Sequence, residues 1–158
     1  MELPVDVAAF LVVRRSSILD RAAIEVANRR LPHYEAAGSE EVAARLAALF
    51  DVVVEASAER HLEGALGHAD VIADARHQTG HDLNEIQRAI NSLEEQIWQS
   101  VIDDAPPNEQ GYILGVVSTV LGAVKDRLAC AYVSRAASKP THTLRIDELF
   151  LGTASGQA

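Results

Sequence analysis

The sequence is poor in the residues that most catalytic and cofactor sites depend on. Cys130 is the only cysteine, so no disulfide can form within the chain, and its apolar surroundings ("LACAYV") predict a buried, inert thiol. Aromatic residues make up only 4%, which disfavours a haem pocket, because such pockets are walled by large apolar and aromatic side chains. Lysine occurs only at Lys125 and Lys139, which disfavours a phosphotransfer histidine with a lysine beside it.

An excess of positive charge and long apolar runs are also missing. The net charge is −9, and an acidic surface opposes the phosphate contacts that nucleic-acid binding requires. The apolar stretch near the N-terminus, "AAFLVV", is six residues long and is followed by "RRSS", too short for a membrane span or a secretory signal. We therefore expect a cytoplasmic protein with neither nucleic acid nor membrane as a partner.

What the chain does contain favours helices. Hydrophobic residues make up 48%, alanine and leucine are frequent, and only five prolines interrupt 158 residues. The length fits one domain. We predict an all-α bundle of about five helices, with a globin-like arrangement as an alternative. The predicted helices cover residues 6–30 (with a weak point at Ser16-Ser17), a stretch that starts at Ser39 as N-cap, 69–78, a stretch that follows Asp82, and 108–136.

These helices predict a division of the chain at residue 138. Residues 1–138 are expected to form the bundle, and residues 139–158 a C-terminal extension that is partly disordered. Within the extension, Leu144, Leu149 and Phe150 are expected to dock a short helical segment onto the bundle.

The helix that follows Gly80 carries the clearest pattern. Gly80 suits the end of one helix, and Asp82 with Glu85 forms a capping-box pair at the start of the next. Glu85 is also placed to pair with Arg88 on the solvent side. Apolar residues then repeat at 3-4-3-4 spacing, which is typical of a seam between helices and predicts a dimer interface; they are Leu83, Ile86, Ile90, Leu93 and Ile97. Trp98, one residue off this seam, is expected in the core.

Small residues form a stripe on the last predicted helix. Gly111, Gly115, Ser118 and Gly122 recur at helical spacing. Each glycine costs roughly 1 kcal/mol in a helix interior, so their recurrence predicts that another backbone lies close against the stripe. We assign this stripe to the dimer interface as well.

Six histidines raise the possibility of a metal site. His77 and His81 are four residues apart, which on one helix would place both rings on one face. The break predicted at Gly80 and Asp82 would separate them, and no Glu-x-x-His pair of a di-iron bundle occurs. Histidines at helix ends are more often capping or solvent-facing residues. We therefore predict no metal and no cofactor, with a metal-, haem- or small-ligand-binding bundle as the alternative.

No motif of an enzyme is present. The serines lack a Gly-x-Ser-x-Gly elbow, and no Gly-x-x-x-x-Gly-Lys loop occurs. We assign no catalytic residue and predict a protein that is not an enzyme.

Two stretches resemble a known family. "SSILDRAAIEVANRRLPHY" and "ADARHQTGHDLNEIQRAINSLEEQIWQSV" are similar to the N-terminal sensor domain of RsbR/RsbRD-type proteins, the RsbT co-antagonists of bacterial stress signalling; related domains precede histidine kinases and transcription regulators. Where that pattern has a tryptophan in the first helix, this chain has Ala22-Ala23. The resemblance implies a non-enzymatic, often dimeric sensor that passes a conformational change to a signalling partner, here in trans because no output domain follows.

Overall fold

The computed structural model describes residues 4–138, which form seven helices and no strand. The all-α bundle is confirmed, with two more helices than we predicted. The C-terminal extension, including the segment around Leu144, Leu149 and Phe150, lies outside the described residues. In chain order the helices are α1 (Val7–Val13), α2 (Arg15–Asn28), α3 (Pro32–Ala37), α4 (Ser39–Glu59), α5 (Glu63–Gln78), α6 (Leu83–Asp104) and α7 (Pro107–Ser138).

The two additional helices come from the N-terminal part. The helix predicted for residues 6–30 is interrupted at Arg14, whose backbone leaves the helical region (φ −104°, ψ 6°), two residues before the weak point at Ser16. Pro32 then starts the short helix α3, for which no helix was predicted; proline suits the first helical position because it lacks just the N–H that a helix leaves unbonded there.

Two helix starts differ from the prediction. The N-cap of α4 is Gly38 with φ +89°, and Ser39 is already the first helical residue. Helix α5 begins at Glu63, six residues before the predicted start, and so includes Gly64 and Gly67. Burial of a small apolar face outweighs the low helix propensity of these glycines; the buried residues of α5 are Ala65, Ala69 and Ala73.

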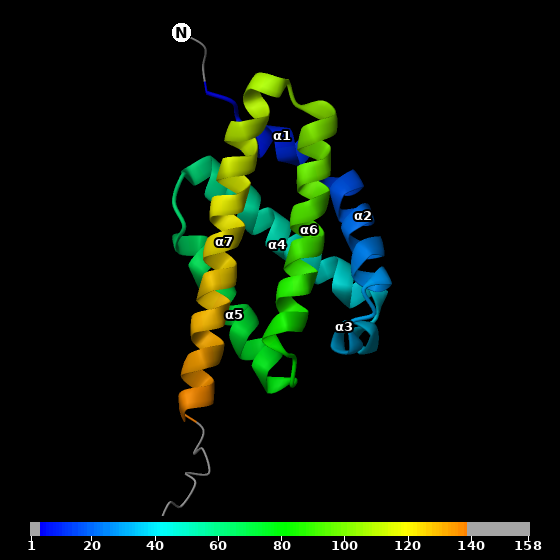
Figure 1. Cartoon of the computed structure of the whole chain (residues 1–158), viewed down its shortest axis with the longest axis vertical. Helices are drawn as coiled ribbons and strands as arrows, with labels where there is room; N and C mark the ends of the chain where they lie inside the picture. Colours follow the sequence, from blue (N-terminus) through cyan, green and yellow to red (C-terminus); the bar gives the residue numbers. More distant parts are fainter. Residues whose placement is uncertain (1–3, 139–158) are drawn as a thin grey trace, which may run out of the picture.

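The long helices set the architecture. α6 and α7 form an antiparallel hairpin, and α4 crosses behind it (Figure 1). α2 packs along α6, while α5 packs along α7. The core between them is aliphatic, apart from one phenylalanine and one tyrosine; its fully buried large side chains are Phe50, Leu11, Ile18, Ile86, Leu93, Ile97, Ile113, Leu121, Leu128, Val53, Val101 and Val117.

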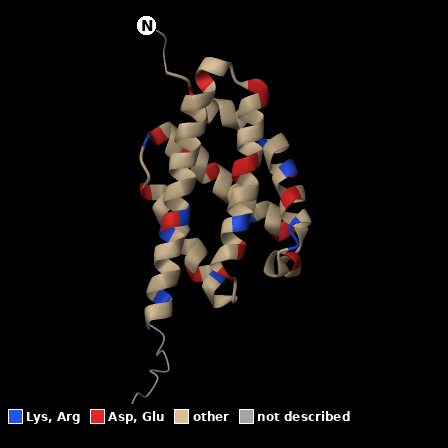
Figure 2. Ribbon diagram, in the orientation of Figure 1, with Lys and Arg blue, Asp and Glu red and all other residues tan. Residues whose placement is uncertain are grey.

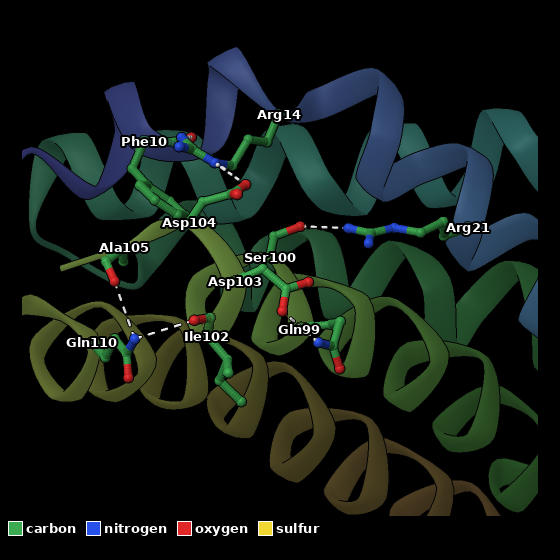
Figure 3. A network of polar contacts seen from close by, with 10 residues as sticks. All are labelled: Phe10, Arg14, Arg21, Gln99, Ser100, Ile102, Asp103, Asp104, Ala105 and Gln110. Carbon is green, nitrogen blue, oxygen red and sulfur yellow. Dashed lines mark hydrogen bonds and ion pairs between the residues drawn. The ribbon is translucent and has the colours of Figure 1, made fainter. Parts of the chain in front are cut away.

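Three arginines, at the start, in the middle and at the end of α2, form polar contacts with α6. The Arg14 Nε lies 2.9 Å from Asp104, Arg21 donates to the Ser100 hydroxyl, and Arg29 donates to both carboxylate oxygens of Glu95; the first two contacts are drawn in Figure 3. Each half-exposed ion pair of this kind contributes at most about 1 kcal/mol. The contacts therefore fix how the two helices lie against each other, and the buried aliphatic face stabilises them.

The turn between α6 and α7 is closed by Gln110. Its side-chain amide donates to the carbonyl oxygens of Ala105 and Ile102, at 3.0 and 3.3 Å (Figure 3). These bonds satisfy carbonyls that the end of α6 would otherwise leave without a partner. α7 begins at Pro107, so Asn108, the predicted cap, lies inside its first turn.

Candidate functional site

The apolar seam of α6 faces the interior of its own chain. Ile86, Ile90, Leu93 and Ile97 are each at most 3% exposed, and Leu83 is partly buried. The seam packs against α2 and α7. A second copy could reach these residues only if one of those helices moved away.

The small-residue stripe of α7 lies on the outside of the bundle instead. Gly111 and Gly115 are exposed, and Ser118 and Gly122 are half-buried. A Cβ atom added to any of the three glycines would meet no atom within 4 Å. The close backbone that we expected against this stripe is therefore not supplied by residues 4–138.

Large apolar side chains flank the stripe. Trp98 is 43% exposed, which corrects its predicted place in the core, and Ile102 of the same helix is 54% exposed. Tyr112 of α7 is 46% exposed. No charged residue occurs between Glu109 and Lys125, so this half of α7 shows no charge in Figure 2. The face is uncharged and bounded by aromatic and aliphatic groups, as the centre of a protein interface usually is.

Beside this face, a groove of about 1250 Å³ runs between α7, α1 and the end of α4. Gly111 and Gly115 line it on the α7 side, and the exposed Val12 and Val13 line it on the α1 side. The Thr119 and Ser57 hydroxyls in it bond to carbonyls of their own helices. The groove therefore offers mostly apolar surface.

Cys130 is exposed on α7, which corrects the predicted buried thiol. Leu128, two residues earlier, is fully buried, and a step of two residues turns a helix by roughly 200°. Because "LACAYV" is apolar throughout, its composition does not show which of its residues lie on the exposed side of the helix.

A second cluster of polar groups gathers where α5 turns into α6. Gly80, with φ +78°, ends α5 in a Schellman motif: its N–H bonds to the His77 carbonyl at 3.2 Å, and the His81 N–H bonds to the Arg76 carbonyl at 2.9 Å. Gly80 is thus confirmed as the end of the helix. The motif turns the chain sharply, so His81 points back into the bundle and is only 6% exposed.

His81 meets His33 and Glu85 there. The His33 and His81 rings lie 4.6 Å apart between centroids, with planes 33° apart. The Glu85 carboxylate accepts from the His33 backbone N–H, and its other oxygen lies 2.7 Å from His33 Nδ1. Asp82 is the N-cap of α6, but its side chain makes no capping bond. Glu85 is buried against His33, which corrects both its predicted capping-box role and its predicted pairing with Arg88.

The surroundings shift the ionisation of this cluster. Burial, followed by the nearby His33 and Arg76, lowers the pKa of His81. For Glu85, burial acts to raise the pKa, but the bonds from His33 outweigh it and the pKa is lowered. At neutral pH the cluster therefore holds an ionised carboxylate and a neutral His81.

His77 and His81 do not come together as a pair. His77, on α5, packs edge-on against Tyr132 at 5.6 Å between ring centroids, while His81 packs edge-on against Tyr34 at 5.4 Å. No three His, Cys, Asp or Glu side chains within residues 4–138 are grouped so that they could hold a metal ion. We expected histidines at helix ends to cap helices or to face solvent, whereas His81 is buried.

The pairing of His33 with His81 escaped the sequence analysis because it joins distant parts of the chain. The only local signal was His81-x-x-x-Glu85, a histidine and a carboxylate at helical spacing, which the helix break obscured.

Comparisons of the chain with protein-family models, curated proteins and solved structures give no match. No helix within residues 4–138 is both long and apolar enough to cross a membrane.

Proposed function

We propose that this chain is a non-enzymatic regulatory domain of bacterial signalling that acts by binding proteins through the outer face of α7, and that it forms a homodimer there. The outer face consists of Gly111, Gly115, Ser118, Gly122, Ala129 and Val133, with the exposed Asp126 one turn after Gly122. The resemblance to RsbR-type sensor domains supports the signalling role, with a signalling protein bound in trans.

One observation carries the proposal: the glycines of α7 leave space that no described part of the chain uses. Relative to alanine, three glycines in a helix interior cost about 3 kcal/mol in total. This is a large fraction of a typical free energy of unfolding of about 5–15 kcal/mol. A second helix lying close against Gly111, Gly115 and Gly122 would use the space and offset that cost.

A second copy fits the face in antiparallel orientation. Gly122 is midway between Gly111 and Val133, and also midway between Gly115 and Ala129. Two antiparallel α7 helices that cross at Gly122 therefore place each Val133, which is 68% exposed, opposite a glycine of the other copy. The larger side chains of one helix then fill the gaps left by the other, and the contact is the same on both sides, as a two-fold dimer requires.

Flanking side chains provide anchors for such an interface. Trp98 and Ile102 of α6 and Tyr112 of α7 are all at least 43% exposed, and residues of this kind contribute most of the binding energy in many interfaces. Their burial on dimerisation would also reduce the exposed apolar area of the bundle.

The experiment is sedimentation of the full chain at micromolar concentrations. We expect wild type to form dimers and Gly115→Leu to be monomeric with an unchanged helical spectrum, because a Cβ atom at this position meets nothing within 4 Å among residues 4–138. Gly64→Leu on α5, which is equally unobstructed, is the matched control and should remain dimeric. A folded wild-type monomer at these concentrations, or a dimeric Gly115→Leu variant, would overturn the proposal.

The second candidate is a bundle that binds a small ligand, haem or a metal, and the groove beside α7 supports its small-ligand form. Its volume of about 1250 Å³ is ample for a drug-sized ligand. Elemental analysis and an absorbance spectrum of the purified protein separate the candidates. A stoichiometric transition metal or a Soret band would favour the second one.

A further inference from the structure

His81 occupies a position at which three parts of the fold meet. Its ring contacts His33 and Tyr34 of α3. Its backbone carbonyl accepts a hydrogen bond of 2.9 Å from the Tyr132 hydroxyl of α7. His81 thus joins the turn between α5 and α6 to both α3 and the C-terminal part of α7.

The hydrogen bonds around Thr79 identify the neutral tautomer of His81. The Thr79 Oγ1 lies 3.2 and 3.1 Å from the carbonyl oxygens of Ala75 and Arg76, either of which can accept its proton. The hydroxyl can then accept from His81 Nδ1, 2.7 Å away. This tautomer is favoured because a ring proton on Nε2 would be a buried donor with no acceptor among the described residues. Nε2 then carries a lone pair and no proton. It is buried and has no hydrogen-bond partner among the described residues.

A second proton on this ring has no favourable place. It would create a buried N–H donor with no acceptor among the described residues, which is unfavourable, and more so because the ring is then charged. Among the described residues, the only carboxylate that acts on the ring is that of Glu85, and it is already bonded to His33. The titratable and charged groups that face His81 come from five helices: His33 and Tyr34 (α3), Arg45 (α4), Arg76 (α5), Glu85 (α6) and Tyr132 (α7).

We propose that His81 is a proton-operated latch. In its neutral form it holds the α5–α6 turn against α3 and the C-terminal part of α7, and its protonation releases this corner of the bundle. Histidine suits the role because it gains its charge close to physiological pH. The latch does not depend on the dimer proposed above, since its readouts are local to this corner.

The direction of the pH effect follows from proton linkage. Burial lowers the pKa of His81 below its ordinary value of 6.5 in the closed corner, whereas an opened corner restores the ordinary value. The closed state therefore binds fewer protons than the open one. Closure is most favourable above pH 6.5 and is weakened as the pH falls below it, by at most about tenfold in the opening constant between pH 7.5 and 5.5.

The test is amide hydrogen exchange of the full chain at pH 7.5 and 5.5, corrected for the intrinsic effect of pH on exchange. In wild type we expect opening of residues 76–85 and 128–135 to increase at the lower pH, by at most about tenfold. His81→Gln should abolish this increase, whereas His61→Gln, at an exposed histidine in the α4–α5 turn, should behave as wild type. Tyr132→Phe should leave the increase in residues 76–85 and remove it from residues 128–135.

Two results would overturn the latch. One is wild-type exchange that does not change with pH, or a His81→Gln variant that keeps the full increase. The other can be obtained without any variant: nitrogen chemical shifts of the imidazole rings that show His81 titrating at or above pH 6.5 in the folded protein. A Tyr132→Phe variant whose residues 128–135 respond as in wild type would disprove the connection to α7.

Discussion

Both carboxylate oxygens of Glu85 are held by a single residue, His33: one accepts from its backbone N–H and the other from its ring, each at 2.7 Å. The carboxylate is almost fully buried, with 6% of the residue exposed. It comes from the first turn of α6 and reaches the first turn of α3. The contact therefore joins two helix starts that lie far apart in the sequence, and it holds the His33 ring against that of His81.

Replacing Glu85 by glutamine should destabilise the fold. The amide keeps the shape of the side chain but loses the charge that strengthens both bonds, which are worth roughly 1.5–3 kcal/mol each with an ionised partner. We expect Glu85→Gln to lower the free energy of unfolding at pH 7 by about 1–3 kcal/mol, as measured by urea denaturation.

The pH dependence of the same variant provides its control. The pKa of Glu85 is lowered in the folded state from its ordinary value of 4.5, so its stabilising contribution is complete above pH 4.5 and is lost as the pH falls below it. Wild type and Glu85→Gln should therefore differ most at pH 7 and less at pH 3. Curves that stay equally far apart at both pH values would show that the charge of Glu85 is not what stabilises this corner.

One pair of isoleucines on α6 distinguishes the core from the exposed face. Ile97 is fully buried and Ile102 is 54% exposed, yet both are isoleucines of the same helix. Ile97→Ala should lower the free energy of unfolding by about 2–5 kcal/mol, and Ile102→Ala by about 0.5 kcal/mol or less. The comparison is made by urea denaturation at a concentration where the chain is monomeric, because dimerisation itself adds stability. Equal losses for the two variants would contradict the assignment of the seam to the core.

The sequence predicted those parts of the fold that depend on local periodicity. The 3-4-3-4 repeat of α6 does form a contact between helices, and all of its residues except the partly buried Leu83 are buried. The break in the first helix lies within two residues of Ser16. What periodicity does not specify is which helix an apolar face packs against, so the seam could not be distinguished from a dimer contact before the positions of α2 and α7 were known.

The histidine cluster shows a different limit. Gly80 predicted a helix end, and a Schellman motif places the next residue on a defined path, so the burial of His81 follows partly from local rules. The neighbour that buries it, His33, comes from α3. This helix has six residues, and no periodic pattern in the sequence predicts it. The role of Glu85 was misassigned because the capping-box pattern is local, whereas its bonds to His33 are set by tertiary packing.

The exposure of Cys130 gives a direct test of the rotation of α7 about its axis. The thiol is exposed, while Leu128 and Val124 on the same helix are fully buried. A thiol-specific chromogenic reagent should therefore modify Cys130 in the native protein at a rate within about tenfold of that in urea, because no opening of the fold has to come first. A thiol that reacts only as fast as the chain unfolds would mean that α7 is rotated relative to this structure, and the outward position of Gly111, Gly115 and Gly122 would then be wrong as well.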